Sequence, residues 1–302
     1  MAISMIQAPS PSPLLQWLSN QWSIEPEIGS VDVEGATVRY RRWRGAPADA
    51  GARPGLAFVH GFMAHARWWD HIAPHFRNRF DVIASDFTGM GDSDRRPGYA
   101  RRQYSREILA AAAHAGLTDV TLIAHSFGGL CALNAAMASQ GLVRRVILID
   151  SHVFLPPKTD RERRKPEPER RYATAQEAME RYRLTPPAAA AVPEIVAYIA
   201  RHSLREADGR WGWKFDPQIV GMDNDAELRR AVRTMSLPVD FVHAECSAVI
   251  GPSESAELRT QLRALDRFVT VPVSDHHIMI EQPVALVAAL DGLLEQPRQM
   301  VR

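Results

Sequence analysis

The sequence has few cysteines, no long apolar run and almost no net charge. Its 302 residues include only Cys131 and Cys246, too few for the disulfide framework of a small secreted domain, so we expect a reduced, cytoplasmic setting. The 36 basic and 35 acidic residues leave a net charge of +1, and no overall field attracts nucleic acid or an anionic membrane. The longest apolar runs, such as RVILID at 145–150, have the length of a strand, far below the roughly 20 residues of a membrane helix.

Other signatures are missing as well. Residues 1–27 lack the basic start and the continuous apolar stretch of a secretory signal peptide, and we interpret them as a cytosolic N-terminal extension. GMGDS at 89–93 is not followed by the lysine that a phosphate-binding loop needs. No spacing of histidine, cysteine and carboxylate residues is typical of a metal site. We therefore expect no cofactor and no metal.

Strand-length apolar runs alternate with helix-like segments over most of the chain. This alternation predicts a mostly parallel central sheet with helices on both faces. A helix is expected at 67–76, where RWWDHIAPHF has a helical period. We expect strands at 28–44 (two strands joined at Glu34-Gly35), 56–60, 80–86, 120–125, 144–150, 237–246 and 267–273.

The alternation stops between residues 152 and 235. We find no buried strand run there, and a stretch rich in proline and charge is followed by helix-like pieces such as PEIVAYIARHSL at 193–204. We therefore predict an α/β core made of residues 28–151 and 236–302, interrupted by a helical insertion at 152–235.

The stretch IAHSFGGL at 123–130 places small residues around one serine. The strand before it runs directly into a helix, and the tight turn between them has room only for small neighbours such as Ala124 and Gly128. Gly129 lets the helix pack close to the strand. Such a turn presents the Ser126 hydroxyl at the sheet edge beside backbone N–H groups, which favours a nucleophile. The alternative is that Ser126 only caps the helix.

Together with three further motifs, this turn resembles the α/β-hydrolase superfamily. AHSFGG at 124–129 resembles its nucleophile elbow, with alanine in place of the usual first glycine. FVHGFMAHARWW (58–69) resembles the superfamily's oxyanion strand-end, and DFTGMGDSD (86–94) resembles the loop after its fourth strand. HHIMIEQP (276–283) resembles its catalytic-histidine loop. The resemblance covers about 28–150 and 237–294. It implies an α/β-hydrolase fold, with the insertion as a cap over the site.

A nucleophilic serine needs a base, and the resemblance implies a histidine in the loop after the last strand. A proline follows His276 by seven positions, which is the spacing of the superfamily, so we predict His276 as the base. The neighbouring His277 stays an alternative. The backbone amides of Phe62 and Phe127 are implied as the oxyanion hole, because they follow the HG pair and the nucleophile.

The acid departs from the superfamily pattern, which usually has an aspartate where this chain has Ser247. Asp150 ends the sixth predicted strand, and Glu245 lies two positions before Ser247. We favour Asp150, because its strand end lies beside the nucleophile strand and brings a short side chain to the same sheet edge. Glu245 has a longer reach and an extra rotor to immobilise. It stays open that Asp150 only caps a turn.

The resemblance implies a serine hydrolase that cleaves an ester, lactone or thioester through an acyl-enzyme, with Ser126, His276 and Asp150 as catalytic residues. One alternative is hydrolysis of a carbon–carbon bond next to a carbonyl by the same residues. Another is a non-catalytic binder of small molecules, in which Ser247 reflects lost catalysis. The expected partner is a small-molecule substrate with an apolar acyl or ring portion, without nucleic acid or membrane insertion. A homodimer stays open.

Overall fold

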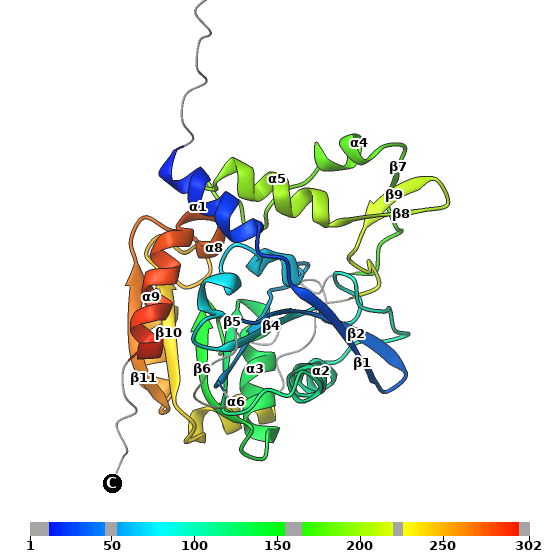
Figure 1. Ribbon diagram of the computed structural model, residues 1–302. Coiled ribbons are helices and arrows are strands. Elements are labelled where there is room, and N and C mark those ends of the chain that lie inside the picture. Colours follow the sequence, from blue (N-terminus) through cyan, green and yellow to red (C-terminus); the bar gives the residue numbers. More distant parts are fainter. Residues whose placement is uncertain (1–11, 46–52, 155–164, 220–225, 296–302) are drawn as a thin grey trace, which may run out of the picture.

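The computed structural model describes residues 12–45, 53–154, 165–219 and 226–295. Its centre is an eight-stranded sheet with the order β1-β2-β4-β3-β5-β6-β10-β11 (Figure 1). β1 and β4 pair antiparallel with β2, and all other neighbours run parallel, so the predicted mostly parallel sheet is confirmed. The strands are β1 Glu27–Val33, β2 Ala36–Trp43, β3 Gly55–Val59, β4 Asp81–Ser85, β5 Val120–His125, β6 Val143–Ile149, β10 Val239–Ala244 and β11 Leu265–Val271.

The central strands are buried on both faces. Every residue of β5 is buried, and successive side chains point to opposite sides of the sheet. Leu122 and Ala124 join one buried apolar cluster, while Ile123 between them joins the other. This double burial explains why the strand is a continuous apolar run in the sequence instead of an alternating pattern.

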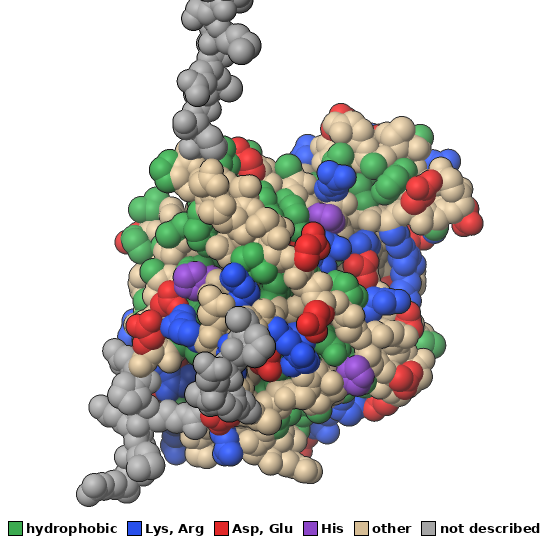
Figure 2. Space-filling model, viewed as in Figure 1, with side chains coloured by type: hydrophobic (Ala, Val, Ile, Leu, Met, Phe, Trp, Pro, Cys, Tyr) green, Lys and Arg blue, Asp and Glu red, His purple; other side chains and the backbone are tan. Residues whose placement is uncertain are grey.

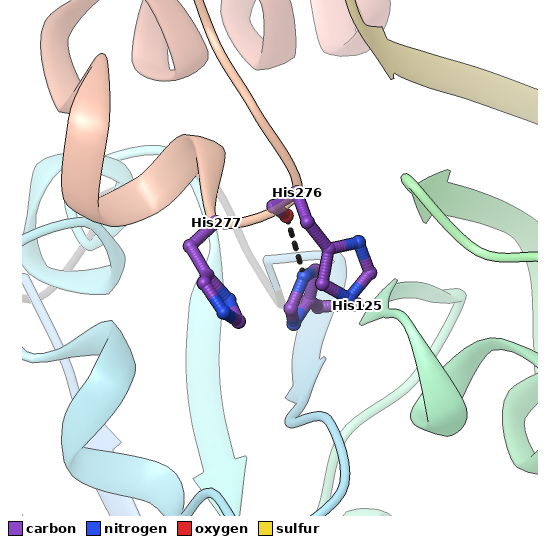
Figure 3. A group of neighbouring side chains, drawn as sticks. All are labelled: His125, His276 and His277. Atoms are coloured by element: carbon purple, nitrogen blue, oxygen red, sulfur yellow. Dashed lines mark hydrogen bonds between the residues drawn. The ribbon is translucent and has the colours of Figure 1, made fainter. Parts of the chain in front are cut away.

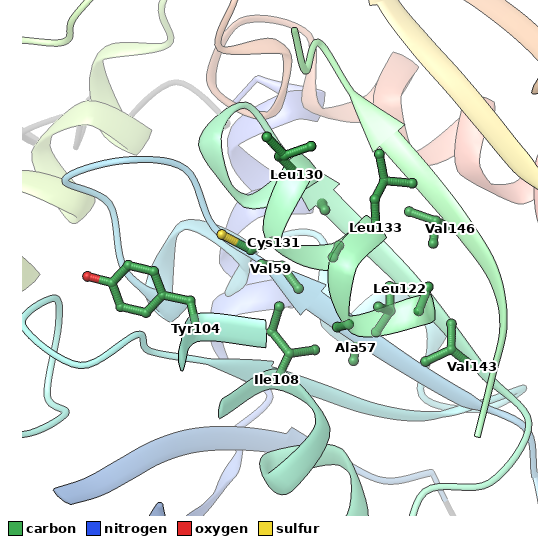
Figure 4. Packing of buried hydrophobic residues seen from close by; sticks show 14 of the residues in the cluster. Ala57, Val59, Tyr104, Ile108, Leu122, Leu130, Cys131, Leu133, Val143 and Val146 are labelled. Atoms are coloured by element: carbon green, nitrogen blue, oxygen red, sulfur yellow. The ribbon is translucent and has the colours of Figure 1, made fainter. Parts of the chain in front are cut away.

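Helices cover both faces of the sheet. On one face, Leu130 and Leu133 of α3 pack into the same cluster as Leu122 and Val146 of the sheet (Figure 4). α2, α6 and α7 contribute to this cluster, and α1, α8 and α9 contribute to the cluster on the other face. No helix in the described ranges is long and apolar enough to cross a bilayer. The helices are α1 Pro13–Trp22, α2 Arg101–His114, α3 Phe127–Ala138, α6 Ala226–Thr234, α7 Pro252–Gln261, α8 Ile278–Glu281 and α9 Pro283–Glu295.

The helix expected at 67–76 is instead two short 3₁₀ turns, Ala66–Trp69 and Ala73–Phe76. Pro74 has no N–H to donate back along a helix, which prevents a continuous α-helix through this segment. Trp69 and Phe76 are nevertheless buried in the same cluster as α9. The apolar residues of this segment are therefore buried as predicted from their pattern, but the segment does not form an α-helix.

The described part of the predicted insertion, residues 165–219, contains strands as well as helices. Its strands form a separate antiparallel sheet with the order β7-β9-β8, which the predicted helical insertion did not include. Asp208 and Gly209 join two of these strands with φ values of 53° and 68°, the backbone geometry of a two-residue hairpin turn. The elements are β7 Arg171–Tyr172, α4 Ala175–Met179, α5 Pro193–His202, β8 Leu204–Ala207 and β9 Arg210–Trp213.

The last helix of the predicted insertion, α6, packs with the α/β core. Leu228 and Val232 of α6 are buried in the same cluster as Leu130 and Leu133 of α3. Their spacing of four residues puts both side chains on one face of α6, and this face is covered by the core. α6 therefore packs with the core, although it lies within the insertion that the sequence predicts to end at residue 235.

The predicted N-terminal extension is part of the folded body where the structure describes it. Leu18 of α1 is fully buried among side chains of α9 and the sheet. Trp22 stacks on Tyr198 of α5, with the ring centroids 4.7 Å apart. The Tyr198 hydroxyl donates to Asp70, which also binds Arg41 of β2 at 2.7 Å. α1 thus connects the insertion with the core.

The lobe that carries β8 and β9 meets the core through charged contacts. Glu169 accepts a hydrogen bond from Arg95 of the core at 2.7 Å and others from Arg171 and Arg205 of the lobe. Figure 2 shows basic side chains, in blue, gathered beneath this overhanging lobe. The two parts therefore touch through polar groups here, whereas α5 is anchored to the core by apolar packing.

Leu18→Ala should lower the free energy of unfolding by about 2–5 kcal/mol, because it removes a fully buried side chain and leaves a cavity between α1 and the sheet. Urea unfolding followed by tryptophan fluorescence measures the change. Ser19→Ala, an exposed substitution on the same helix, should stay within about 0.5 kcal/mol of the wild type. Equal stability of the two variants would contradict the packing of α1 on the core.

Candidate active site

Ser126 lies at the tight turn between β5 and α3. Its backbone has φ 53° and ψ −123°, a strained combination for a residue with a side chain. A Cβ on Gly128 would lie 2.5 Å from the His60 carbonyl oxygen, and a Cβ on Gly129 would collide with Ser151. Glycine is therefore required at both positions for the helix to start so close to the strand. The Ser126 hydroxyl makes no capping hydrogen bond to α3, so the capping role considered for it is not what the hydroxyl does.

The hydroxyl of Ser126 is instead hydrogen-bonded to an imidazole. His276 Nε2 lies 2.8 Å from Ser126 Oγ, and His276 Nδ1 lies 2.7 Å from Asp150 Oδ2. His276 and Asp150 are both buried. The three residues follow β5, β6 and β11, whose carboxyl ends share one edge of the sheet. The structure therefore brings together the serine, base and acid that the sequence predicts.

Asp150 is held by the loop in which the superfamily usually carries its acid. The Ser247 hydroxyl donates to Asp150 Oδ2 at 2.6 Å, and the Ala244 amide donates to Oδ1 at 3.3 Å. Ser247 Oγ also accepts the amides of Val249 and Ile250 at 3.1 and 2.9 Å. These two donors occupy its lone pairs, so its single proton points to Asp150. From the sequence, Ser247 was recognised only as the position where the usual aspartate is absent, and its hydrogen bond to Asp150 was not predicted.

The alternative acid and the alternative base have other hydrogen-bond partners. Glu245 accepts the amide of Val273 at 2.9 Å in an exposed loop. His277 donates from Nε2 to the carbonyl of Pro186 at 3.1 Å, and burial lowers the pKa of His277 to about 4. Both residues are thus hydrogen-bonded to backbone groups, whereas Ser126 is hydrogen-bonded to His276.

Two buried imidazoles brace the loops around the site. His60 donates from Nδ1 to the Gly61 carbonyl at 2.7 Å and accepts the Phe87 amide at 3.1 Å. His125 donates from Nε2 to the His276 carbonyl at 2.9 Å. Burial lowers the pKa of His60 to about 4 and holds the pKa of His125 well below its usual range. Both rings are therefore neutral near pH 7.

The residues predicted for the oxyanion hole, Phe62 and Phe127, lie close to the serine. Phe127 is the first residue of α3, so its N–H is among those without an acceptor inside the helix. Phe62 follows Gly61 at the end of the β3 loop, and its ring lies 5.5 Å from the Phe127 ring. Both amides stay a prediction as oxyanion donors.

A cavity of about 330 Å³ opens onto Ser126 and His276 beneath the insertion. Among the described residues that line it, none is Asp or Glu. Lys214 pairs at 2.6 Å with Asp92, which does not line the cavity. The aromatic lining residues are Phe62, Trp68, Tyr172, Tyr182, Trp213 and Phe215, and the basic ones are Arg170, Arg181, Arg183 and Lys214. Sequence reasoning did not find this basic set.

One group of side chains in this cavity has donors suited to a metal ion. The imidazoles of His125, His276 and His277 each offer one ring nitrogen, and these nitrogens all lie within 4.8 Å of one another (Figure 3). His125 comes from the end of β5, whereas the other two follow β11. The sequence predicted no metal ligands, because residues so far apart form no recognisable spacing.

Comparison with known proteins identifies relatives of this chain. Residues 56–290 match the profile of the alpha/beta hydrolase family. Esterase Rv0045c from Mycobacterium tuberculosis (strain ATCC 25618 / H37Rv) is 26% identical over 283 residues, 89% of this chain and 90% of that protein. N-formylmaleamate deformylase from Pseudomonas putida is 29% identical over 42% of this chain and 46% of its own length. The chain matches less than half of the length of several curated relatives.

Solved structures show the same fold at low sequence identity. The crystal structure of esterase Rv0045c has a TM-score of 0.69 and 20% identity, and the match covers 96% of this chain and all of that one. The structure of E-2-(acetamidomethylene)succinate hydrolase has a TM-score of 0.71 and 20% identity, covering 90% of this chain and 100% of that one. At this sequence identity, the two structures show that the fold is shared.

Asp150→Asn should slow the reaction of Ser126 with a fluorophosphonate probe by roughly 10⁴-fold, because an amide favours the wrong tautomer of His276. Ser247→Ala removes one hydrogen bond from the acid and leaves its charge, so its loss should be much smaller. Glu245→Gln should react at close to the wild-type rate. Mass spectrometry of the labelled protein measures the rates.

Circular dichroism of each variant controls for folding. A loss in Glu245→Gln as large as that in Asp150→Asn would contradict the assignment of the acid. Labelling of Asp150→Asn at the wild-type rate would mean that its carboxylate only caps the turn after β6.

Proposed function

Because the chain belongs to the alpha/beta hydrolase family, we propose that it is a serine hydrolase that cleaves a carboxylic acid derivative through an acyl-enzyme. The observation that carries the proposal is the continuous chain of hydrogen bonds from Asp150 to His276 at 2.7 Å and from His276 to Ser126 at 2.8 Å. A buried carboxylate, an imidazole and a hydroxyl in this order are what makes a serine nucleophilic at neutral pH.

The proposed reaction begins when Ser126 Oγ attacks the acyl carbon and its proton passes to His276 Nε2. Asp150 stabilises the resulting imidazolium through the Nδ1–H group. The backbone N–H groups of Phe62 and Phe127 hold the oxyanion of the tetrahedral intermediate. The imidazolium then protonates the leaving group as its bond to carbon breaks. A water molecule that gives its proton to His276 hydrolyses the acyl-enzyme and releases the acid and free Ser126.

Esters, lactones and thioesters are the proposed substrates. The relative that matches over 90% of its own length is named an esterase, which favours an ester bond. A carbon–carbon bond next to a carbonyl would react through the same three residues, so the choice of bond depends on the substrate that the cavity admits. A panel of p-nitrophenyl esters of increasing chain length tests the first choice.

The size and lining of the cavity suggest a small substrate with a ring or an apolar acyl chain. A volume of about 330 Å³ lies near the lower end of the range for small-molecule pockets. Trp68 and Phe62 from the core face the same cavity as Trp213 and Tyr182 from the insertion. A flat apolar group between these aromatic side chains would bury much of its surface.

The charge of the lining favours a substrate that also carries a carboxylate. Four basic side chains and no carboxylate line the cavity among the described residues, and a cleft lined by charges of one sign attracts a ligand of the opposite sign. Three of these bases also pair with carboxylates outside the lining, at 2.6–4.0 Å. The Arg181 guanidinium lies over the Tyr172 ring at 5.8 Å, which places it beside the aromatic lining. Two relatives are named for N-formylmaleamate and (acetamidomethylene)succinate, whose names denote carboxylates.

Ser126→Ala should abolish turnover of the p-nitrophenyl esters, with a loss on the order of 10⁴-fold or more. The smaller side chain relieves crowding at the turn, so the fold should be retained. Hydrolysis and fluorophosphonate labelling are measured on the same preparations. Hydrolysis by the variant at the wild-type rate would contradict the nucleophile. A wild-type protein that neither hydrolyses esters nor reacts with the probe would be the non-catalytic binder.

Arg181→Gln should lower kcat/KM for an ester with a terminal carboxylate by roughly two- to five-fold, because an exposed charge pair contributes up to about 1 kcal/mol. A neutral ester of the same length should be affected much less. Arg201→Gln is the matched control, since Arg201 is exposed on α5 and does not line the cavity. Equal effects on the charged and the neutral ester would contradict carboxylate recognition.

A further inference from the structure

Three imidazoles meet at the floor of the cavity, where the catalytic base is one of them. His125, His276 and His277 are each no more than 4% exposed, yet all three line the cavity. Figure 3 shows the three rings side by side, with His125 between the other two. Trp68 packs edge-on against the His277 ring, with centroids 5.5 Å apart. The rings therefore border the cavity and are shielded from bulk water.

Two of these rings have a nitrogen without a hydrogen-bond partner. His125 and His277 each use Nε2 to donate to a backbone carbonyl, that of His276 and that of Pro186. A neutral imidazole has one proton, so Nδ1 of each ring carries a lone pair. Within the described part of the chain, neither Nδ1 atom has a hydrogen-bond partner. A buried polar atom left unpaired is costly and calls for an explanation.

The third lone pair belongs to the base itself. His276 Nδ1 donates to Asp150, so Nε2 is the nitrogen that accepts the serine proton. Each of the three rings thus offers one nitrogen, and these nitrogens lie within 4.8 Å of one another in the cavity. Asp150 stands behind His276 as the carboxylate that commonly orients a metal-bound histidine.

We propose that His125, His276 and His277 form a binding site for a transition-metal ion such as Zn²⁺, and that the bound ion switches off the serine. Imidazole nitrogens are ligands for Zn²⁺, Ni²⁺ and Cu²⁺, and three histidines with one open position are a known zinc arrangement. Mg²⁺ and Ca²⁺ prefer oxygen ligands and are excluded by this donor set.

The geometry indicates reversible binding. With Zn–N bonds of about 2.0–2.1 Å, ligand nitrogens in a tetrahedral site lie about 3.4 Å apart. The present nitrogens all lie within 4.8 Å of one another, so any remaining difference is closed by small ring rotations. His276 and His277 precede α8 on a loop and are the rings that move, whereas His125 is fixed at the end of β5. Because part of the binding free energy is used to rotate the rings, we expect the metal to bind reversibly.

Inhibition follows from the position of the ion, and this step rests on the proposed function. A metal bound to His276 Nε2 uses the lone pair that has to accept the proton of Ser126. The hydroxyl then has no base and does not attack the acyl carbon. Binding of the ion itself needs no catalytic role for any of the three rings.

The test uses the full chain and two measurements. Co²⁺ added to the metal-free protein should give the visible absorption of a low-coordinate nitrogen site, and Zn²⁺ should displace it. Zn²⁺ should also slow fluorophosphonate labelling of Ser126, with EDTA restoring the rate and Mg²⁺ having no effect. Absence of Co²⁺ and Zn²⁺ binding would overturn the site. Metal binding to a protein whose serine never reacts would leave the site standing and contradict the proposed function.

Variants locate the ion. His125→Gln and His277→Gln each keep a donor near the position of Nε2 and remove the Nδ1 lone pair. Each should weaken Zn²⁺ inhibition by at least the roughly 10–100-fold seen when a group that only supports a metal ligand is lost. Each variant is compared with its own metal-free labelling rate, and the two substitutions are independent of each other.

Cys246→Ser is the matched control, because this exposed thiol is another candidate ligand for Zn²⁺ outside the cluster. The substitution should leave both Co²⁺ absorption and Zn²⁺ inhibition unchanged. Loss of inhibition in Cys246→Ser, or full inhibition in both histidine variants, would show that the ion binds elsewhere and would overturn the proposal.

Discussion

The buried hydrogen bond between Asp150 and His276 is the contact on which the site depends. It joins residues 126 positions apart and turns the ring so that Nε2 faces Ser126. Asp150 comes from the end of β6, whereas Ser247, at the usual acid position, follows β10. The two strands are neighbours in the sheet, so an acid on either strand end reaches the same point. The hydroxyl left behind at Ser247 holds the carboxylate in place.

Reactive groups and recognition groups come from different parts of the chain. Ser126, His276 and Asp150 stand at strand ends of a sheet buried on both faces, and tight packing fixes their positions. The basic side chains and several aromatic side chains of the cavity come from the insertion, which meets the core partly through polar contacts such as Glu169 with Arg95. A buried frame that carries the reactive groups is thus combined with a cavity wall that comes from a separate segment of the chain.

The sequence was most informative where one local rule determines the structure. Doubly buried strands are continuous apolar runs, and small residues mark the turn at Ser126, so the sheet and the serine could be predicted. The 3₁₀ turns around Pro74 and the hairpin at Asp208-Gly209 carry local signals that a search for helical spacing overlooks. The hydrogen bond of Ser247 and the meeting of His125 with His277 depend on which loops lie together, and no local pattern contains that information.

The position of Asp150 has a mechanical consequence. Asp150 lies two residues before the predicted start of the insertion at residue 152. A movement at this end of the insertion therefore acts on the chain next to the acid. Two hydrogen bonds from the β10 side, from Ser247 and the Ala244 amide, anchor the carboxylate independently of its own backbone. The acid is therefore held from two sides, by the end of its own strand β6 and by hydrogen bonds from the neighbouring β10 side.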